Sequence, residues 1–202
     1  VNCPSVFNCG ISYFHTLIII IKPAQCQKRR KKVEKNRDVT TILKIMKFIL
    51  IDKVLSIESG ERIRTIKGVS LAEEYLGDHF PAFPVLPGVL LLQGLIESAS
   101  WLVRQSEDFA HSMILLQKAR NVKYKSFAGP GKHIEYEVRV KDLSEEKSSF
   151  TASGICGEEP IVEAKISLRH FNLSQRDPKM AETDKKIVEQ LRQRWKLLNG
   201  QN

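Results

Sequence analysis

Apolar residues recur at helical spacing between Val89 and Gln105, and this pattern predicts a long helix. The recurring positions are Val89, Leu92, Ile96, Ala99 and Val103. They fall on one face of a 3.6-residue repeat. Gly94 and the neighbouring leucines leave almost no polar face in the first half of the segment. We therefore expect this helix to be buried nearly all round.

Rough alternation of apolar and polar residues predicts six strands around the helix. Two precede it, over Phe48–Ile57 and Arg62–Val69. Four follow it, over Met113–Ser126, His133–Leu143, Lys147–Cys156 and Pro160–Phe171. Glycine and proline residues supply turns between them. One helix embedded in six antiparallel strands is an α+β layout.

The segment Asp78–Pro87 stands directly before the helix and contains three prolines, Pro81, Pro84 and Pro87. Proline fixes φ and lacks an N–H, so the segment can be neither a helix interior nor a central strand. We expect a rigid, extended loop, led into by a short helix over Leu71–Tyr75.

The start of the long helix has a chemical consequence. Its first N–H groups lack internal partners and carry partial positive charge, so they can hold a carbonyl oxygen. Gly88 lets a ligand approach the backbone, and His79 lies on the loop just before it. An imidazole and a polarising helix end could therefore meet at one substrate. The alternative is a loop histidine that only hydrogen-bonds a neighbour.

The stretch HFPAFPVLPGVL resembles the signature of the beta-hydroxyacyl-acyl-carrier-protein dehydratases. The resemblance extends from Phe48 to about Phe171 and includes FILIDKVLSIESG and LLQKARNVKYKSFAGPG. It implies a hotdog fold, in which a curved antiparallel sheet of about six strands wraps a long central helix. It also implies a dimer, or a dimer-based oligomer, with each active site between two subunits.

By the same resemblance, His79 matches the catalytic histidine, and Gly88 matches the glycine whose N–H polarises the thioester carbonyl. Gln93 stands where the family has glutamate or aspartate. An amide can orient a hydroxyl but cannot act as a general acid. Glu97 lies one turn further along the same helix face. It is either a relocated catalytic carboxylate or a buried, hydrogen-bonded structural residue.

The substrate and its carrier have candidate contacts of their own. Candidate substrate-binding residues beside His79 and Gly88 are Phe80, Phe83, Pro87 and Val89. A basic cluster comprises Lys118, Arg120, Lys123 and Lys125, with Arg104 near the helix end. It is either a docking surface for an acidic acyl carrier protein or an ordinary solvated strand face.

The composition predicts three parts. Of the net charge of +9, residues 1–45 contribute +7, from nine Lys or Arg and two Asp or Glu. We expect these residues to be a basic, disordered leader, or an artefact of a start assigned upstream of Met46. Residues 46–172 form the hotdog domain, and 173–202 an amphipathic helix. The remaining charge of +2 does not indicate a nucleic-acid partner.

The four cysteines, Cys3, Cys9, Cys26 and Cys156, show neither paired spacing nor nearby histidines arranged as zinc ligands. We predict no metal, no disulfide and no cofactor. This cysteine usage indicates a reducing compartment, and we expect a cytoplasmic protein.

Two classes of function follow. The first is a hydro-lyase that converts a 3-hydroxyacyl thioester into the trans-2-enoyl thioester in fatty-acid or related lipid or polyketide synthesis. The thioester is carried by acyl carrier protein or coenzyme A. The second is a non-catalytic subunit that binds the acyl thioester or its carrier, and a hotdog thioesterase is a variant of the enzyme hypothesis. Acyl chain length, carrier and pathway stay open.

Overall fold

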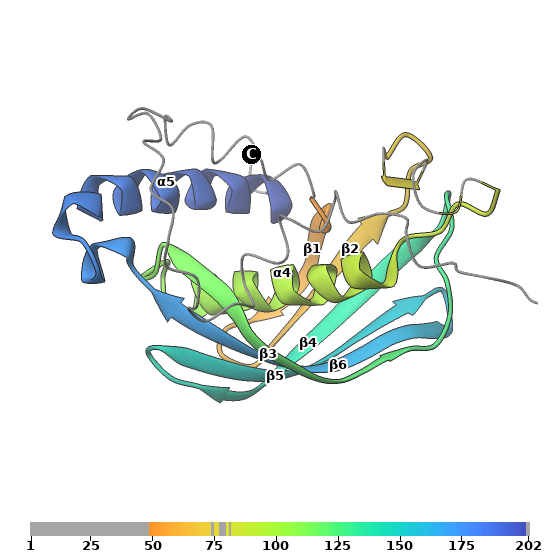
Figure 1. Ribbon diagram of the computed structural model, residues 1–202, viewed down its shortest axis with the longest axis horizontal. Helices are drawn as coiled ribbons and strands as arrows, with labels where there is room; N and C mark the ends of the chain where they lie inside the picture. The colour runs from red at the N-terminus through yellow and green to blue at the C-terminus, as the bar shows by residue number, and fades with distance from the viewer. Residues whose placement is uncertain (1–48, 74, 77–79, 81, 201–202) are drawn as a thin grey trace, which may run out of the picture. The chain divides into compact units, whose positions relative to one another are not determined.

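One antiparallel sheet wraps a single long helix, α4 (Gly88–Ser106), and this architecture confirms the predicted hotdog fold (Figure 1). The computed structural model describes residues 49–200 except 74, 77–79 and 81. The strands are β1 (Lys53–Glu58), β2 (Arg62–Gly68), β3 (Met113–Tyr124), β4 (His133–Leu143), β5 (Lys147–Cys156) and β6 (Glu159–Phe171). Their order in the sheet is β1-β2-β4-β5-β6-β3, so β1 and β3 are the edge strands.

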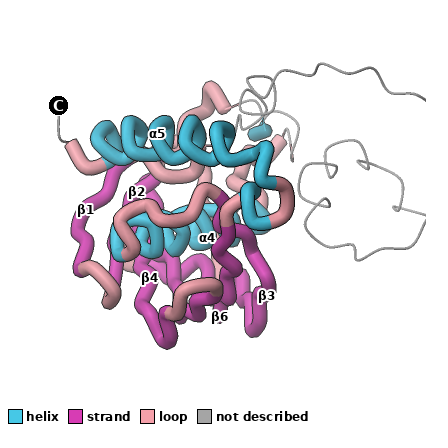
Figure 2. Tube along the Cα trace, turned by 90° about the vertical axis from the view of Figure 1, so that its left-hand side faces the viewer, coloured by secondary structure: helices cyan, strands magenta, loops and turns pink. Residues whose placement is uncertain are grey.

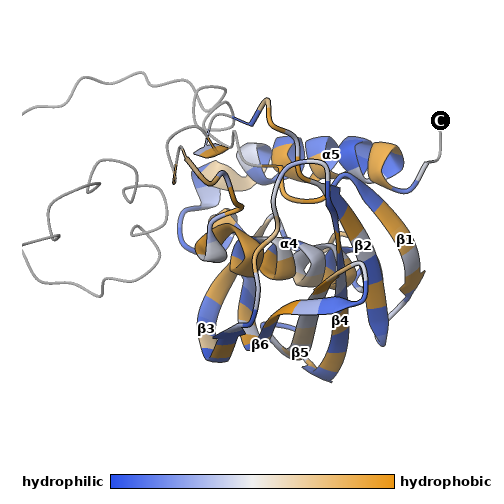
Figure 3. Ribbon diagram, turned by 90° about the vertical axis from the view of Figure 1, so that its right-hand side faces the viewer, coloured by the Kyte–Doolittle hydropathy of each residue, from blue (hydrophilic) through white to orange (hydrophobic). Residues whose placement is uncertain are grey.

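The core lies between α4 and the concave face of the sheet. Eleven of the 19 residues of α4 are buried, and they include Leu95 and Leu102 at 0% exposure. Ile134 and Val138 of β4 point toward the helix and are equally buried. Successive side chains of a strand face opposite sides, so polar residues alternate with these on the outer face. Figure 3 shows this alternation along the strands, and an almost entirely hydrophobic start of α4.

A glycine allows α4 to approach the sheet closely. A Cβ atom at Gly94 would lie 2.5 Å from Cζ of Tyr136 in β4. The Tyr136 ring is fully buried, so it could not move aside into solvent. The missing side chain of Gly94 therefore makes room for the Tyr136 ring, and this contact sets the spacing between the helix and the sheet.

A second helix, α5 (Ala181–Leu198), covers the side of α4 that faces away from the sheet (Figures 1 and 2). It follows two short 3-10 turns, η1 (Leu173–Gln175) and η2 (Pro178–Met180). Trp195 of α5 stacks on Trp101 of α4 with ring centroids 5.8 Å apart. The predicted amphipathic pattern thus packs α5 on the domain. Neither α4 nor α5 is long and apolar enough to cross a bilayer.

Two predicted elements differ from the structure. The first strand begins at Lys53 instead of Phe48. Leu50 precedes the strand because its N–H donates to the carboxylate of Glu97, at 3.0 Å, and not to a neighbouring strand. The segment expected as a helix over Leu71–Tyr75 begins with a turn, in which Ser70 Oγ accepts from the N–H of Ala72 at 3.2 Å.

Candidate active site

The loop before α4 is anchored at its final residues. The N–H of Leu86 donates to the carbonyl of Ala128 at 2.8 Å, and Val85 and Leu86 are both buried. Pro87 forms the N-cap of α4 with φ −54° and ψ 136°, an extended conformation. The loop is therefore held against the segment after β3, and the start of α4 is fixed in position.

The first turn of α4 presents a backbone donor that has no partner among the residues the structure describes. The N–H groups of Leu90 and Leu91 both donate to the carbonyl of Pro87, at 2.8 and 3.2 Å. No side chain caps the helix, and its first turn holds no acidic residue. Within the described residues, the N–H of Gly88 makes no hydrogen bond. This donor lies at the positive end of the helix dipole, where it can stabilise a developing oxyanion.

Tyr124, at the end of β3, forms a wall beside this donor, and the sequence analysis did not identify it. A Cβ atom at Gly88 would lie 3.2 Å from Cε1 of Tyr124 and 3.3 Å from its Cδ1. The ring is half exposed, at 51%. Partial burial raises the pKa of its hydroxyl. The sequence gives little evidence that Tyr124 belongs to the site, because the alternating pattern of β3 predicts only that it lies in a strand.

The candidate catalytic His79 lies outside the described residues, and its role remains a prediction. The next residue, Phe80, has a φ of 50°, which is uncommon for a non-glycine residue. Its carbonyl accepts from the N–H of Phe83 at 2.8 Å, which closes a tight turn. The expectation of an extended loop is therefore wrong at Phe80–Phe83, where the chain turns sharply.

Aromatic side chains gather on the surface around this turn. Phe83 and Phe127 make an edge-to-face contact with centroids 6.2 Å apart. Both rings are mostly exposed, as is Phe80. Of the other candidate substrate-binding residues, Pro87 and Val89 are partly buried at the start of α4. All four candidates therefore belong to the loop or to the first turn of α4.

Gln93 lies in α4 five residues beyond Gly88, and its side chain is partly buried. Among the described residues, its amide has no hydrogen-bond partner. The amide is therefore available to a ligand, as an acceptor through its oxygen and as a donor through its nitrogen.

Glu97 has both carboxylate oxygens engaged. One accepts from the N–H of Leu50 at 3.0 Å, and the other from Nη2 of Arg194 in α5, also at 3.0 Å. Burial raises the pKa of Glu97, although Arg194 opposes this shift. The arrangement supports the structural alternative for Glu97, in which the carboxylate joins three segments of the chain.

The basic cluster divides into two parts. Lys118, Arg120 and Lys123 are exposed on edge strand β3, and Lys125 is exposed directly after it. Lys125 pairs with Glu163 of β6 at 2.5 Å. Arg104 is different, because its guanidinium lies 5.3 Å from the ring centroid of Trp101. Burial lowers the pKa of Arg104 to about 10. Arg104 thus packs on Trp101, whereas the other four basic residues are exposed, and a docking role for the cluster stays a prediction.

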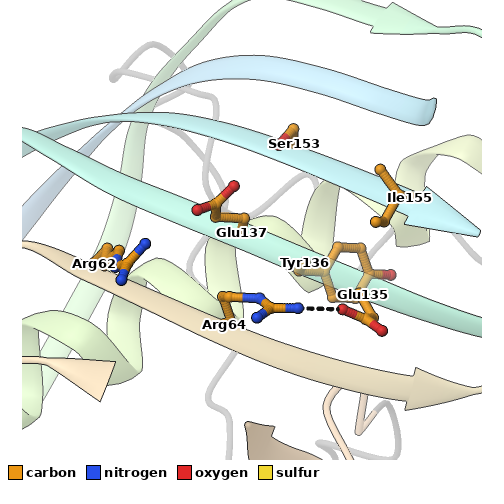
Figure 4. Close-up of a pocket in the computed structure, with 7 residues that line it drawn as sticks. All are labelled: Arg62, Arg64, Glu135, Tyr136, Glu137, Ser153 and Ile155. Atoms are coloured by element: carbon orange, nitrogen blue, oxygen red, sulfur yellow. Dashed lines mark hydrogen bonds and ion pairs between the residues drawn. The ribbon is translucent and has the colours of Figure 1, made fainter. Parts of the chain in front are cut away.

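A shallow hollow of about 230 Å³ lies elsewhere, over β2, β4 and β5 (Figure 4). Its lining includes Arg64 and Glu135, which pair at 2.8 Å across the outer face of the sheet. None of the candidate site residues borders it. We do not assign it a role in the site at α4.

The chain matches a protein family and named relatives over most of its length. A family described as FabA-like domain matches residues 43–165. The chain is 32% identical over 142 residues to 3-hydroxyacyl-(acyl-carrier-protein) dehydratase FabZ of Albidiferax ferrireducens, covering 65% of this chain and 95% of that protein. It is 30% identical over 144 residues to the FabZ of Variovorax paradoxus, covering 67% and 96%.

A solved structure, the dehydratase heterocomplex ApeI:P from Xenorhabdus doucetiae, has the same fold. Its TM-score is 0.55 at 16% identity, and the match covers 66% of this chain and 90% of that one. The likeness in fold agrees with the family match. The chain therefore belongs to the FabA-like family of hotdog-fold dehydratases.

Proposed function

We propose that the protein is a 3-hydroxyacyl-thioester dehydratase that releases water and a trans-2-enoyl thioester. The observation that carries this proposal is the N–H of Gly88, which has no hydrogen-bond partner among the described residues and lies at the positive end of α4, directly after the loop that contains His79. The FabZ relatives, which are named for a 3-hydroxyacyl-acyl-carrier-protein substrate, support it.

In the proposed reaction, His79 removes the proton alpha to the thioester, and the Gly88 N–H holds the developing enolate oxygen. The electron pair then forms the carbon–carbon double bond while the bond from the beta carbon to the hydroxyl oxygen breaks. Gln93 orients the departing hydroxyl, but its amide cannot protonate it. We assign that proton to the His79 imidazolium, so the released water carries the proton taken from the alpha carbon.

This assignment leaves no proton-transfer role for Glu97, whose two oxygens already accept hydrogen bonds. It also predicts that Gln93→Glu accelerates dehydration by supplying a dedicated acid, by about 10² or more. A Gln93→Glu variant that binds the acyl thioester but dehydrates it no faster would contradict a site arranged for dehydration.

Gln93 also favours a second candidate, a non-catalytic subunit of a dehydratase assembly. The Xenorhabdus structure is itself a dehydratase heterocomplex. In this case the chain would bind an acyl thioester without turnover. Co-purification of an active hotdog partner, together with inactivity of the isolated chain, would favour this candidate.

We further propose that an acyl carrier protein delivers the substrate. We also propose that the chain forms a homodimer and that this homodimer and the carrier protein are cytoplasmic. The exposed β3 residues Lys118, Arg120 and Lys123 are suited to steer an acidic carrier. Reversing these charges should raise KM for a carrier-bound substrate and leave KM for the coenzyme A thioester unchanged. Equal effects on both substrates would contradict a docking role.

A further inference from the structure

Two histidines and a glutamate meet at the end of α4 opposite to the proposed active site. Nδ1 of His111 lies 2.9 Å from Oε2 of Glu107, and Nδ1 of His170 lies 3.4 Å from Oε1. One ligand atom from each of the three residues lies within 4.8 Å of the others. His111 and His170 are buried, at 8% and 1% exposure. The group is thus compact and shielded from solvent.

The fold creates this group from distant parts of the chain. After α4 ends, Asp108 and Phe109 both adopt left-handed conformations, with φ of 47° and 60°. This sharp turn reverses the direction of the chain, so that Glu107 and His111 both lie beside His170. Pairing of β3 with β6 sets Met113 opposite Phe171, which brings His170 beside them. The sequence alone predicts no metal, because His170 lies far from Glu107 and His111 along the chain.

His170 has a nitrogen aimed at this group without a hydrogen bond. Its Nε2 lies 2.7 Å from Oγ of Ser148, which is also buried. Its Nδ1 is buried and has no hydrogen-bond partner among the described residues. When Nε2 carries the proton and donates it to Ser148, Nδ1 presents a lone pair to the Glu107 carboxylate. In this tautomer, the Nδ1 lone pair and the carboxylate oxygen 3.4 Å away attract a cation, which is either a proton on Nδ1 or a metal ion bound by both groups.

We propose that Glu107, His111 and His170 form a binding site for a divalent transition metal, with Zn²⁺ the best-suited ion. Two imidazole nitrogens and one carboxylate oxygen are a ligand set that zinc uses, with a fourth position left for water. Zn–N and Zn–O bonds of about 2.0–2.2 Å place neighbouring ligands roughly 3.3 Å apart in a tetrahedral site. The separation of His170 Nδ1 from Oε1 of Glu107, 3.4 Å, is close to this value. The 2.9 Å contact of His111 Nδ1 with Oε2 is a hydrogen bond that coordination would replace.

The surroundings of the group hold its side chains in position for a metal ion. The contact of Ser148 with Nε2 fixes the ring of His170 and leaves Nδ1 free for the metal, as outer partners do at zinc sites. The ion would tie the end of α4 to the last residues of β6. The 19 residues of α4 separate it from Gly88 by roughly 28 Å. The site is therefore distinct from the proposed acyl site and does not depend on the proposed function.

The test is a titration of the full, metal-free chain with ZnCl₂ by calorimetry, and with CoCl₂ by visible absorption. We expect one ion per chain at micromolar affinity and a higher Tm with zinc. The Co²⁺ spectrum should lack thiolate charge-transfer bands, which separates this site from the cysteines. Glu107→Gln and His170→Gln should each weaken binding at least 100-fold. His133→Gln, which alters an exposed histidine of β4, should bind as the wild type does.

Three results would overturn the proposal. They are absence of stoichiometric binding to the wild-type chain, binding that survives Glu107→Gln, and a Co²⁺ spectrum dominated by thiolate bands. The wild-type titration decides the question even if a buried variant fails to fold.

Discussion

Arg194 of α5 donates a hydrogen bond of 3.0 Å to the carboxylate of Glu97 in α4, across 97 positions of the sequence. The contact links the added C-terminal helix to the helix on which the proposed site depends. It also engages the carboxylate nearest in sequence to Gln93. These hydrogen bonds support the structural alternative for Glu97, in which the carboxylate stabilises the domain.

The first prediction follows from this contact. Glu97→Gln should lower the free energy of unfolding by about 2 kcal/mol, because it removes charged hydrogen bonds in a largely buried position. Arg194→Met should lower it similarly, and the double variant should cost less than the sum of the two. Urea unfolding measures all three. A loss of turnover in Glu97→Gln with unchanged stability would instead support a catalytic carboxylate.

The second prediction concerns the spacing of α4 from the sheet. Gly94→Ala should destabilise the fold by about 1–3 kcal/mol, because its Cβ would lie 2.5 Å from the Tyr136 ring. Combining it with Tyr136→Leu should recover part of the loss. Gly129→Ala is the control, because a Cβ there meets only the Pro84 carbonyl oxygen, at 3.6 Å. Equal effects of the two alanine variants would contradict this account.

The third prediction is a pH dependence. Asp184 is buried and accepts from Ser112 Oγ at 2.5 Å and from the N–H groups of Leu173 and Ser174 at 3.0 and 2.9 Å. Burial alone would raise the pKa of Asp184, but these hydrogen bonds hold it below its ordinary value. The stabilisation is therefore complete above the unfolded pKa of about 3.9 and is lost as pH falls through the folded pKa.

Asp184→Asn should accordingly cost about 1–3 kcal/mol at pH 7. The difference from wild type should shrink in unfolding curves measured progressively below pH 4. A difference that stays constant down to pH 2 would show that the ionised carboxylate is not the stabilising form.

The fourth prediction tests the wall beside the Gly88 donor. Gly88→Ala should reduce dehydration by about 10², because its Cβ would displace the Tyr124 ring and occupy the approach to the N–H. Stability should change little, since the ring is half exposed and can shift. Tyr124→Phe should retain activity, because the contacts are to ring carbons, whereas Tyr124→Ala should raise KM. A Gly88→Ala enzyme of undiminished rate would contradict an approach of the thioester past this position.

The sequence predicted the parts of the fold that depend on local patterns. Val89–Gln105 was expected as a helix and forms Gly88–Ser106, and the last strand, expected over Pro160–Phe171, forms Glu159–Phe171. Periodicity suffices for such elements because burial of one face determines them. The first strand was placed too early, because a tertiary bond from Leu50 to Glu97 replaces strand pairing there.

The surroundings of the site could not be predicted from the sequence, because they consist of contacts between residues that are far apart along the chain. No local pattern relates Glu97 to Arg194, Gly88 to Tyr124, or Glu107 to His170. Each pair is created by the order of strands in the sheet or by the packing of α5 on α4. The motif around His79 predicted the family, whereas the partners of each side chain required the structure.

The most direct test of the proposed function is turnover of 3-hydroxybutyryl and 3-hydroxydecanoyl thioesters, followed by the absorbance of the enoyl product. We predict that the wild-type chain forms the enoyl thioester and that His79→Ala loses about 10² to 10⁴ in rate while remaining folded. A wild-type chain that binds the thioester without turnover, or a His79→Ala variant of undiminished rate, would contradict the proposed dehydratase.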